Sequence, residues 1–131
     1  NFSNVKLNYV SPDILKMPKE VMEEVAARNV PQAEYSSLEK VLPETDILYV
    51  TRVQKERFED PADYEKVKGA YVIDPEIMKG AKKDMIVMHP LPRVGEISES
   101  FDDDPRAAYF RQMEYGLYVR MSLLAMVLGK A

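Results

Sequence analysis

Residues 47–50 read ILYV, an uninterrupted apolar run that ends at Thr51 and Arg52. A strand that is apolar on both faces is typical of a parallel sheet covered on both sides. A second run of the same kind, MIVM at residues 85–88, leads into His89. Other strand-like runs and segments of helical length alternate around these two. This alternation predicts an α/β domain with a mostly parallel sheet.

We expect one domain over residues 1–131, Rossmann-like and three-layered, with about five strands and a long carboxyl-terminal helix. Further strands are predicted at residues 5–10, 33–35 and 70–73. Helices are predicted at residues 18–28, 36–41, 61–67, 74–81 and 106–128. Apolar side chains at helical spacing, prolines in first turns and Asp74 as a cap support these helices.

The composition excludes several classes of function. A net charge of -4 argues against binding to nucleic acid or to a membrane surface. With no cysteine and one histidine, the chain offers no disulfide, no thiolate metal site and no His-rich metal site. We expect no cofactor and a reducing, cytoplasmic location. The start at Asn1, without a Met, suggests a fragment of a longer protein.

Arg52 and Gln54 follow the first apolar strand and lie two residues apart. In parallel α/β sheets, ligands bind beyond the carboxyl ends of the strands. Residues two apart on an extended chain face the same side, so both side chains can reach one ligand. A guanidinium suits a carboxylate or phosphate, and an amide can bind an amine. The alternative is a charged loop in solvent, but the position after a buried strand favours a site.

Residues 89–93, HPLPR, follow the second apolar strand. Each proline keeps the preceding residue extended and has no N–H of its own. The loop therefore presents rigid carbonyl oxygens, which suit an amide NH2 or an ammonium group. We expect His89 to orient the loop rather than to catalyse, and one X–Pro bond can be cis. The alternative is a stiff connection without a ligand. We assign no chemistry to the third strand end, at Asp74.

Longer motifs now identify a family. Residues 49–58 (YVTRVQKERF), 88–94 (MHPLPRV), 104–112 (DPRAAYFRQ) and 118–125 (YVRMSLLA) resemble hallmarks of aspartate carbamoyltransferases, in the same order along the chain. Ornithine carbamoyltransferases share the fold but carry a cysteine in the loop that corresponds to residues 89–92. This chain has no cysteine, which disfavours that relative.

The resemblance implies that the protein transfers a carbamoyl group from carbamoyl phosphate to the amine of L-aspartate, in pyrimidine synthesis. Arg52 would grip an aspartate carboxylate and Gln54 would lie close to the amine. Backbone groups of Pro90, Leu91 and Pro92 would hold the carbamoyl amide and the incoming amine, with the Leu91–Pro92 bond cis. No nucleophilic residue, metal or cofactor is implied.

Three further residues, Arg57, Asp63 and Tyr64, match family positions that act when two domains close around the substrates. Many relatives have Asp or Asn where this sequence has Gly95. In some of them that residue partners the tyrosine equivalent to Tyr64. Gly95 has no side chain to offer, so this closing contact is not expected here.

The resemblance also implies missing parts. The chain would be the aspartate-binding domain without its first helix and strand, and without the whole carbamoyl-phosphate-binding domain. That other domain would supply the phosphate loop and would form a homotrimer. The residues of these motifs resemble the eukaryotic type most, in which this domain often lies at the end of a multifunctional polypeptide.

Other classes of function are weighed against this one. A stand-alone α/β binding module for a small anionic ligand would keep Arg52 and Gln54 but would need no partner domain. A dinucleotide-binding module is disfavoured because no G-x-G-x-x-G follows any strand. A degenerate domain kept only for assembly is disfavoured by the intact set of Arg52, Gln54 and residues 90–92.

Overall fold

The computed structural model describes residues 3–130, except for the side chain of Arg57. These residues form two compact units, the first ending at Glu44 and the second beginning at Thr45. Each unit is built around a pair of parallel strands. The predicted α/β class and parallel pairing are confirmed, but the described residues contain four strands in two separate pairs instead of one sheet of about five.

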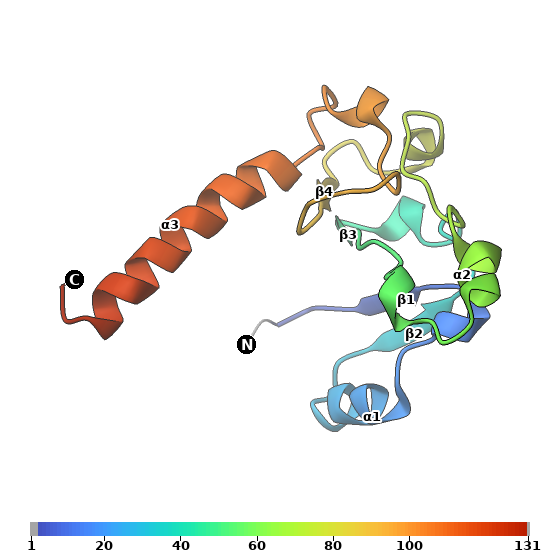
Figure 1. Cartoon of the computed structure of the whole chain (residues 1–131), viewed down its shortest axis with the longest axis horizontal. Coiled ribbons are helices and arrows are strands. Elements are labelled where there is room, and N and C mark those ends of the chain that lie inside the picture. The colour runs from blue at the N-terminus through green and yellow to red at the C-terminus, as the bar shows by residue number, and fades with distance from the viewer. Residues whose placement is uncertain (1–2, 131) are drawn as a thin grey trace. The chain divides into compact units, whose positions relative to one another are not determined.

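The first unit is a strand–helix–strand arrangement. Strand β1 (Leu7–Val10) pairs in parallel with β2 (Gln32–Tyr35), and α1 (Lys19–Ala27) connects them (Figure 1). Helix α1 ends where Asn29 adopts φ 57. Asparagine tolerates this left-handed conformation, which stops a helix. The predicted helix and its end are therefore confirmed.

The predicted helix at residues 36–41 is wrong. The chain forms turns there, followed by a short 3-10 helix at Leu42–Glu44. Pro43 lies within this 3-10 helix and has no N–H, so it cannot donate to a carbonyl of the preceding turn and an α-helix cannot continue through it. The hydroxyl of Ser37 donates to Glu39 at 2.6 Å.

The second unit holds the two apolar runs that decide the fold. Strand β3 (Ile47–Tyr49) pairs in parallel with β4 (Ile86–Met88), with Tyr49 opposite Met88. Val87 is fully buried, whereas Ile47 and Tyr49 are 60% and 54% exposed. Within the described residues of the second unit, β3 is therefore not covered on both faces, contrary to the expectation from its apolar sequence.

The predicted strand at residues 70–73 is also wrong. Only Ile73 pairs, through a single parallel bridge to Ile97. The partner segment is interrupted on one side by Gly95, at φ 114, and on the other by Ser98, which caps a 3-10 helix at Glu99–Phe101. Only Ile97 of this segment is therefore placed to pair, and it pairs with Ile73. The helix expected at residues 74–81 is a short 3-10 helix at Ile77–Gly80, and Asp74 caps its start as predicted.

Two helices complete the second unit. Helix α2 (Pro61–Val67) begins at Asp60, whose carboxylate accepts from the N–H of Ala62 at 2.8 Å. Helix α3 (Tyr109–Val127) is the long carboxyl-terminal helix, and its first residue is fully buried. Just before it, Ala107 forms a parallel bridge to Val87 of β4, which anchors the start of the helix.

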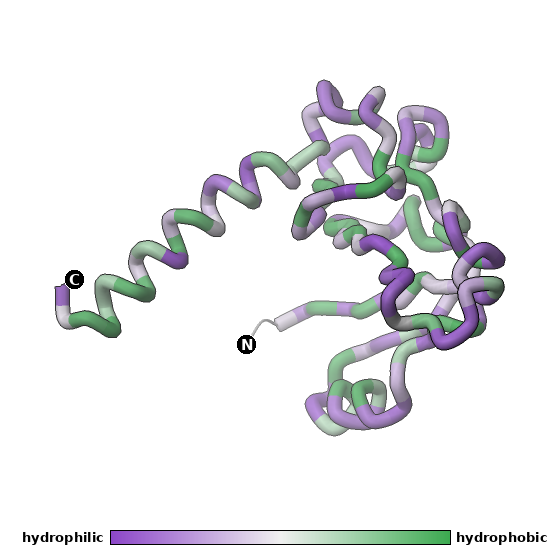
Figure 2. The backbone as a smooth tube through the Cα atoms, viewed as in Figure 1, coloured by the Kyte–Doolittle hydropathy of each residue, from purple (hydrophilic) through white to green (hydrophobic). Residues whose placement is uncertain are grey.

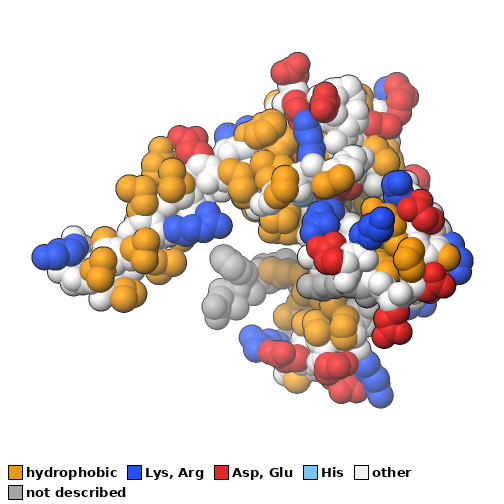
Figure 3. Space-filling model, in the orientation of Figure 1, with side chains coloured by type: hydrophobic (Ala, Val, Ile, Leu, Met, Phe, Trp, Pro, Cys, Tyr) orange, Lys and Arg blue, Asp and Glu red, His pale blue; other side chains and the backbone are white. Residues whose placement is uncertain are grey.

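Beyond its first turn, α3 extends away from the rest of the second unit (Figure 1). Apolar residues recur along its whole length (Figures 2 and 3). Its exposed large hydrophobic residues include Tyr115, Leu117, Val119, Met121, Leu124 and Met126. No helix in residues 3–130 is both long and apolar enough to cross a membrane.

Candidate functional site

The carboxyl ends of β3 and β4 lie side by side. The N–H of Val50 donates to the carbonyl of Met88 at 2.9 Å, so the ladder continues to the last residues of both strands. Thr51 and His89 therefore leave the sheet at the same edge. This edge brings together the two segments in which the sequence places the site, residues 51–57 and 89–93.

Arg52 already holds a carboxylate. Its guanidinium contacts both oxygens of Glu56, with one bond at 3.3 Å and a shorter one between Nη2 and Oε1. This pair raises the pKa of Arg52, first through the hydrogen bond and then through the charge of Glu56. Weaker attraction from Glu96 and Tyr64 raises that pKa further. A residue that follows the loop after β4 and a residue of α2 therefore act on the same guanidinium.

Gln54 is half-buried and immediately precedes a 3-10 helix at Lys55–Arg57. It lies in extended conformation, with φ -85 and ψ 99. The structure thus leaves Arg52 and Gln54 in one short connection between β3 and that helix. The contact of Gln54 with a ligand amine stays a prediction.

The loop after β4 is fixed by His89. This residue is only 1% exposed, and its Nδ1 accepts from the N–H of Leu91 at 2.8 Å. Leu91 adopts φ 45, and the Leu91–Pro92 bond is cis, as the resemblance implied. The expectation that His89 orients the loop is confirmed. Within residues 3–130, the carbonyl oxygens of Pro90 and Leu91 accept no hydrogen bond.

Two of the residues assigned to domain closure have described side chains. Asp63 pairs with Lys66 at 2.6 Å, and Tyr64 packs edge-on against Phe58 with ring centroids 5.7 Å apart. The side chain of Arg57 lies outside the described part. Gly95 adopts φ 114, which residues with side chains rarely adopt. A residue with a side chain would be strained at this position.

A cluster behind the loop was missed by the sequence reasoning. Arg93 makes a two-point contact with Asp102, and the hydroxyl of Tyr109 donates to Asp102 at 2.6 Å. Arg93 holds the pKa of Asp102 at about 2, against an ordinary 3.8. Burial, and then the bond to Asp102, raise the pKa of Tyr109 to about 12. Arg93 lies in a recognised motif, but no local pattern marks its distant partners.

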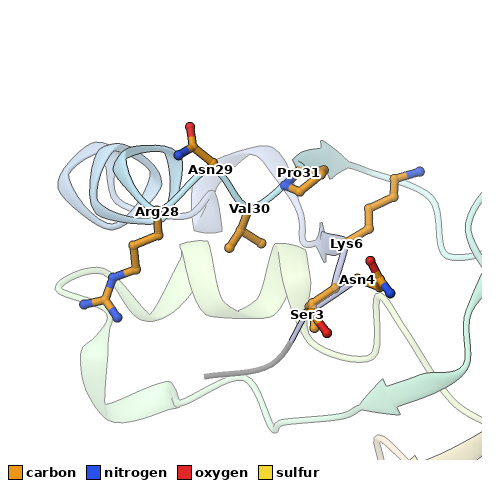
Figure 4. Close-up of a pocket in the computed structure, with 8 residues that line it drawn as sticks. Ser3, Asn4, Lys6, Arg28, Asn29, Val30 and Pro31 are labelled. Atoms are coloured by element: carbon orange, nitrogen blue, oxygen red, sulfur yellow. The ribbon is translucent and has the colours of Figure 1, made fainter.

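The hollow in the first unit is a different feature. It has a volume of about 520 Å³ and is lined by residues 3–6 and 28–31 (Figure 4). Its two cationic side chains are already paired, Lys6 with Glu44 and Arg28 with Glu24. None of the predicted site residues lines it. We therefore assign it no role. The described residues also hold no group of three or more side chains placed to bind a metal ion.

Comparison with known families decides the relationship. The model of the aspartate/ornithine carbamoyltransferase Asp/Orn-binding domain matches residues 1–127. The chain belongs to this carbamoyltransferase family. The resemblance inferred from the motifs is confirmed.

Similar proteins in this family include multifunctional and single-function members. The chain is 59% identical over 125 residues to the multifunctional protein pyr1-3 of Dictyostelium discoideum, covering 95% of this chain and 6% of that protein. It is 50% identical over 129 residues to the aspartate carbamoyltransferase catalytic subunit of Lachnoclostridium phytofermentans, covering 98% of this chain and 42% of that subunit. The chain thus spans less than half the length of either relative.

Solved carbamoyltransferase structures share the fold. The catalytic subunit of M. jannaschii aspartate transcarbamoylase matches with a TM-score of 0.88 and 47% identity, over 99% of this chain and 43% of that one. The Trypanosoma cruzi enzyme, in complex with carbamoyl phosphate and aspartate, matches with a TM-score of 0.81 and 45% identity, over 91% and 40%.

Proposed function

We propose that this chain is the aspartate-binding part of an aspartate carbamoyltransferase. The whole enzyme transfers the carbamoyl group of carbamoyl phosphate to the amine of L-aspartate, and it releases N-carbamoyl-L-aspartate and phosphate in de novo pyrimidine biosynthesis. The observation that carries the proposal is the two-point contact of Arg52 with the Glu56 carboxylate, beside the loop of residues 89–93. The carbamoyl phosphate and aspartate bound by the T. cruzi relative support it.

In this proposal Arg52 exchanges Glu56 for a carboxylate of L-aspartate. A guanidinium matches a carboxylate in geometry and charge, so the exchange replaces one charge-assisted pair with another. Gln54 lies near the amine, and backbone groups of Pro90, Leu91 and Pro92 hold the carbamoyl amide. The reaction needs two aligned substrates and stabilised charge on the carbamoyl and phosphate oxygens, and it needs no nucleophilic side chain.

The rest of the enzyme supplies the remaining groups. We infer a carbamoyl-phosphate domain that binds the phosphate, faces Arg57, Asp63 and Tyr64 on closure, and forms a homotrimer. The exposed apolar side chains of α3 and β3 support such a partner. The cytoplasmic location expected from the sequence is part of the same proposal, and cell fractionation would check it.

Substrate choice tests the proposal directly. The full-length protein is assayed with carbamoyl phosphate and either L-aspartate or L-ornithine, and the carbamoylated product is measured. We expect product from L-aspartate and only background from L-ornithine, because Arg52 can pair with the side-chain carboxylate of aspartate and repels the side-chain ammonium of ornithine. Carbamoylation of L-ornithine, or no product from L-aspartate, would overturn the proposal.

A further inference from the structure

We propose that Glu96 is a positioning residue that fixes the Leu91 backbone through the buried imidazole of His89. The inference rests on the proposed function, because it gives the loop of residues 89–93 a substrate to hold. It adds a residue to that site which is neither in contact with substrate nor within the loop itself.

The contacts of Glu96 span the loop from both ends. Its Oε1 lies 2.7 Å from Nε2 of His89, and its Oε2 accepts from the N–H of Val94 at 2.9 Å. The carboxylate is 13% exposed, and the imidazole is 1% exposed. One carboxylate therefore connects His89, the first residue of the loop, with Val94, the residue after its end.

The protonation of His89 follows from these contacts. The N–H of Leu91 points at Nδ1 over 2.8 Å, and a backbone N–H can only donate. Nδ1 must therefore present its lone pair, which leaves the ring proton on Nε2. Nε2–H then donates to Glu96, and an acceptor at this place selects that tautomer.

The chain of contacts from Glu96 through His89 to the N–H of Leu91, called the relay below, maintains the backbone conformation of Leu91. Its φ of 45 is in the left-handed region, which costs free energy for a residue with a branched side chain. Such a conformation persists only where the surroundings impose it. The bond from Leu91 N–H to His89 does so, and it depends on the tautomer that Glu96 selects.

Two other contacts hold the relay itself in place. The side chain of Gln112, on α3, accepts from the backbone N–H of His89 at 2.9 Å. The carbonyl of Glu96 accepts from the N–H of Ile73 at 2.9 Å. The relay is thus attached to α3 on one side and to the core bridge at Ile73 on the other.

The test uses Glu96→Ala and Glu96→Gln in the full-length protein. Alanine removes both acceptors, whereas glutamine keeps the volume and one carbonyl acceptor, so it can satisfy His89 or Val94 but not both. We expect Glu96→Ala to lower kcat at least tenfold while the KM for carbamoyl phosphate stays within about twofold, because the phosphate is held elsewhere. Glu96→Gln should fall between Glu96→Ala and the unchanged protein. Glu99→Ala, an exposed carboxylate three residues on, is the matched control and should leave kcat unchanged.

A second readout does not depend on activity. Amide hydrogen exchange at Leu91 should be slow in the unchanged protein and in Glu99→Ala, and at least tenfold faster in Glu96→Ala. Unchanged exchange at Leu91 in both Glu96 variants would overturn the inference, even if no substrate is found. Normal exchange and normal kcat in Glu96→Gln would overturn it if Glu96→Ala does not fold. A full-length protein that makes no carbamoyl-aspartate, yet shows the faster exchange, would contradict the proposed function alone.

Discussion

Arg52 and Arg93 each hold a carboxylate, and their surroundings give them different roles. The side chain of Arg52 is 37% exposed and its partner Glu56 is 56% exposed, so their pair contributes little to stability. Arg93 and Asp102 are 18% and 27% exposed and share a bond with buried Tyr109. In the proposed function the first pair is exchanged for a ligand, whereas the second fixes the segment that carries the loop.

Arg52→Ala in the full-length enzyme should raise the KM for L-aspartate by about 10- to 100-fold, from the loss of a charge-assisted contact of about 1.5–3 kcal/mol. If the contact also orients the amine, kcat falls as well. Binding of carbamoyl phosphate should barely change. Steady-state kinetics in both substrates give the answer, and Arg28→Ala, which breaks a similar exposed pair with Glu24, is the matched control. An unaltered KM for L-aspartate would refute the assignment.

The pKa of Asp102 predicts an acid limit on stability. Its folded pKa is depressed from 3.8 to about 2, so its ionised form stabilises the fold. This contribution is present above pH 3.8 and is lost as the pH falls through about 2. After allowance for solvent screening it amounts to about 1–2 kcal/mol.

The acid limit is checked by urea unfolding of Asp102→Asn and of the unchanged protein. The measurements run from about pH 5 to about pH 2, the range over which the stabilisation by Asp102 should be lost. The difference in stability between the two proteins should shrink as the pH falls. Asp103→Asn, an exposed neighbour, serves as control. A difference that stays constant over the whole range would show that Asp102 does not act through its charge.

Elements with a strong local signal were predicted correctly from the sequence. The apolar runs predicted β3 and β4, and proline at the first turn predicted α1 and α2. The predicted helix at residues 36–41 fails because Pro43 has no N–H to continue it. The predicted strand at residues 70–73 fails because only Ile97 is available to pair with it. The sequence could place Arg52 and His89 at one edge of the sheet, because each follows an apolar strand. Glu96, Asp102 and Gln112 could not, because their roles depend on contacts that folding creates.

Helix α2 gives a prediction at the scale of one element. Asp60→Ala removes the acceptor for the N–H of Ala62 and should cost about 1 kcal/mol of helix stability. Because α2 carries Asp63 and Tyr64, amide exchange over residues 61–67 should become faster. Asp60→Asn keeps an equally good cap and should behave as the unchanged protein. Equal exchange in all three proteins would mean that packing alone holds the helix.

At the scale of the molecule, the second unit exposes more apolar surface than its own core covers. Ile47 and Tyr49 of β3 and most large side chains of α3 are exposed. Surfaces of this kind mark contacts with other protein. The proposed carbamoyl-phosphate domain is the partner that we infer for this surface. In the proposed enzyme, this domain binds carbamoyl phosphate and packs against α3.

The last prediction concerns activity across the two halves. The chain alone should make no carbamoyl-aspartate above background, because carbamoyl phosphate is bound elsewhere, and the separately produced amino-terminal half should restore some activity when mixed with it.

Leu124→Glu places a charge on α3 at a side chain that is now 63% exposed, and burying that charge against apolar surface costs several kcal/mol. The variant should therefore need at least tenfold more of the amino-terminal half for the same restoration. Glu114→Gln, which changes a polar position of the same helix, should need no more than the unchanged chain. Turnover by the chain alone would contradict the division of the site between two halves. Equal restoration by Leu124→Glu would show that α3 does not contact the other half, since a buried charge cannot be neutral to binding.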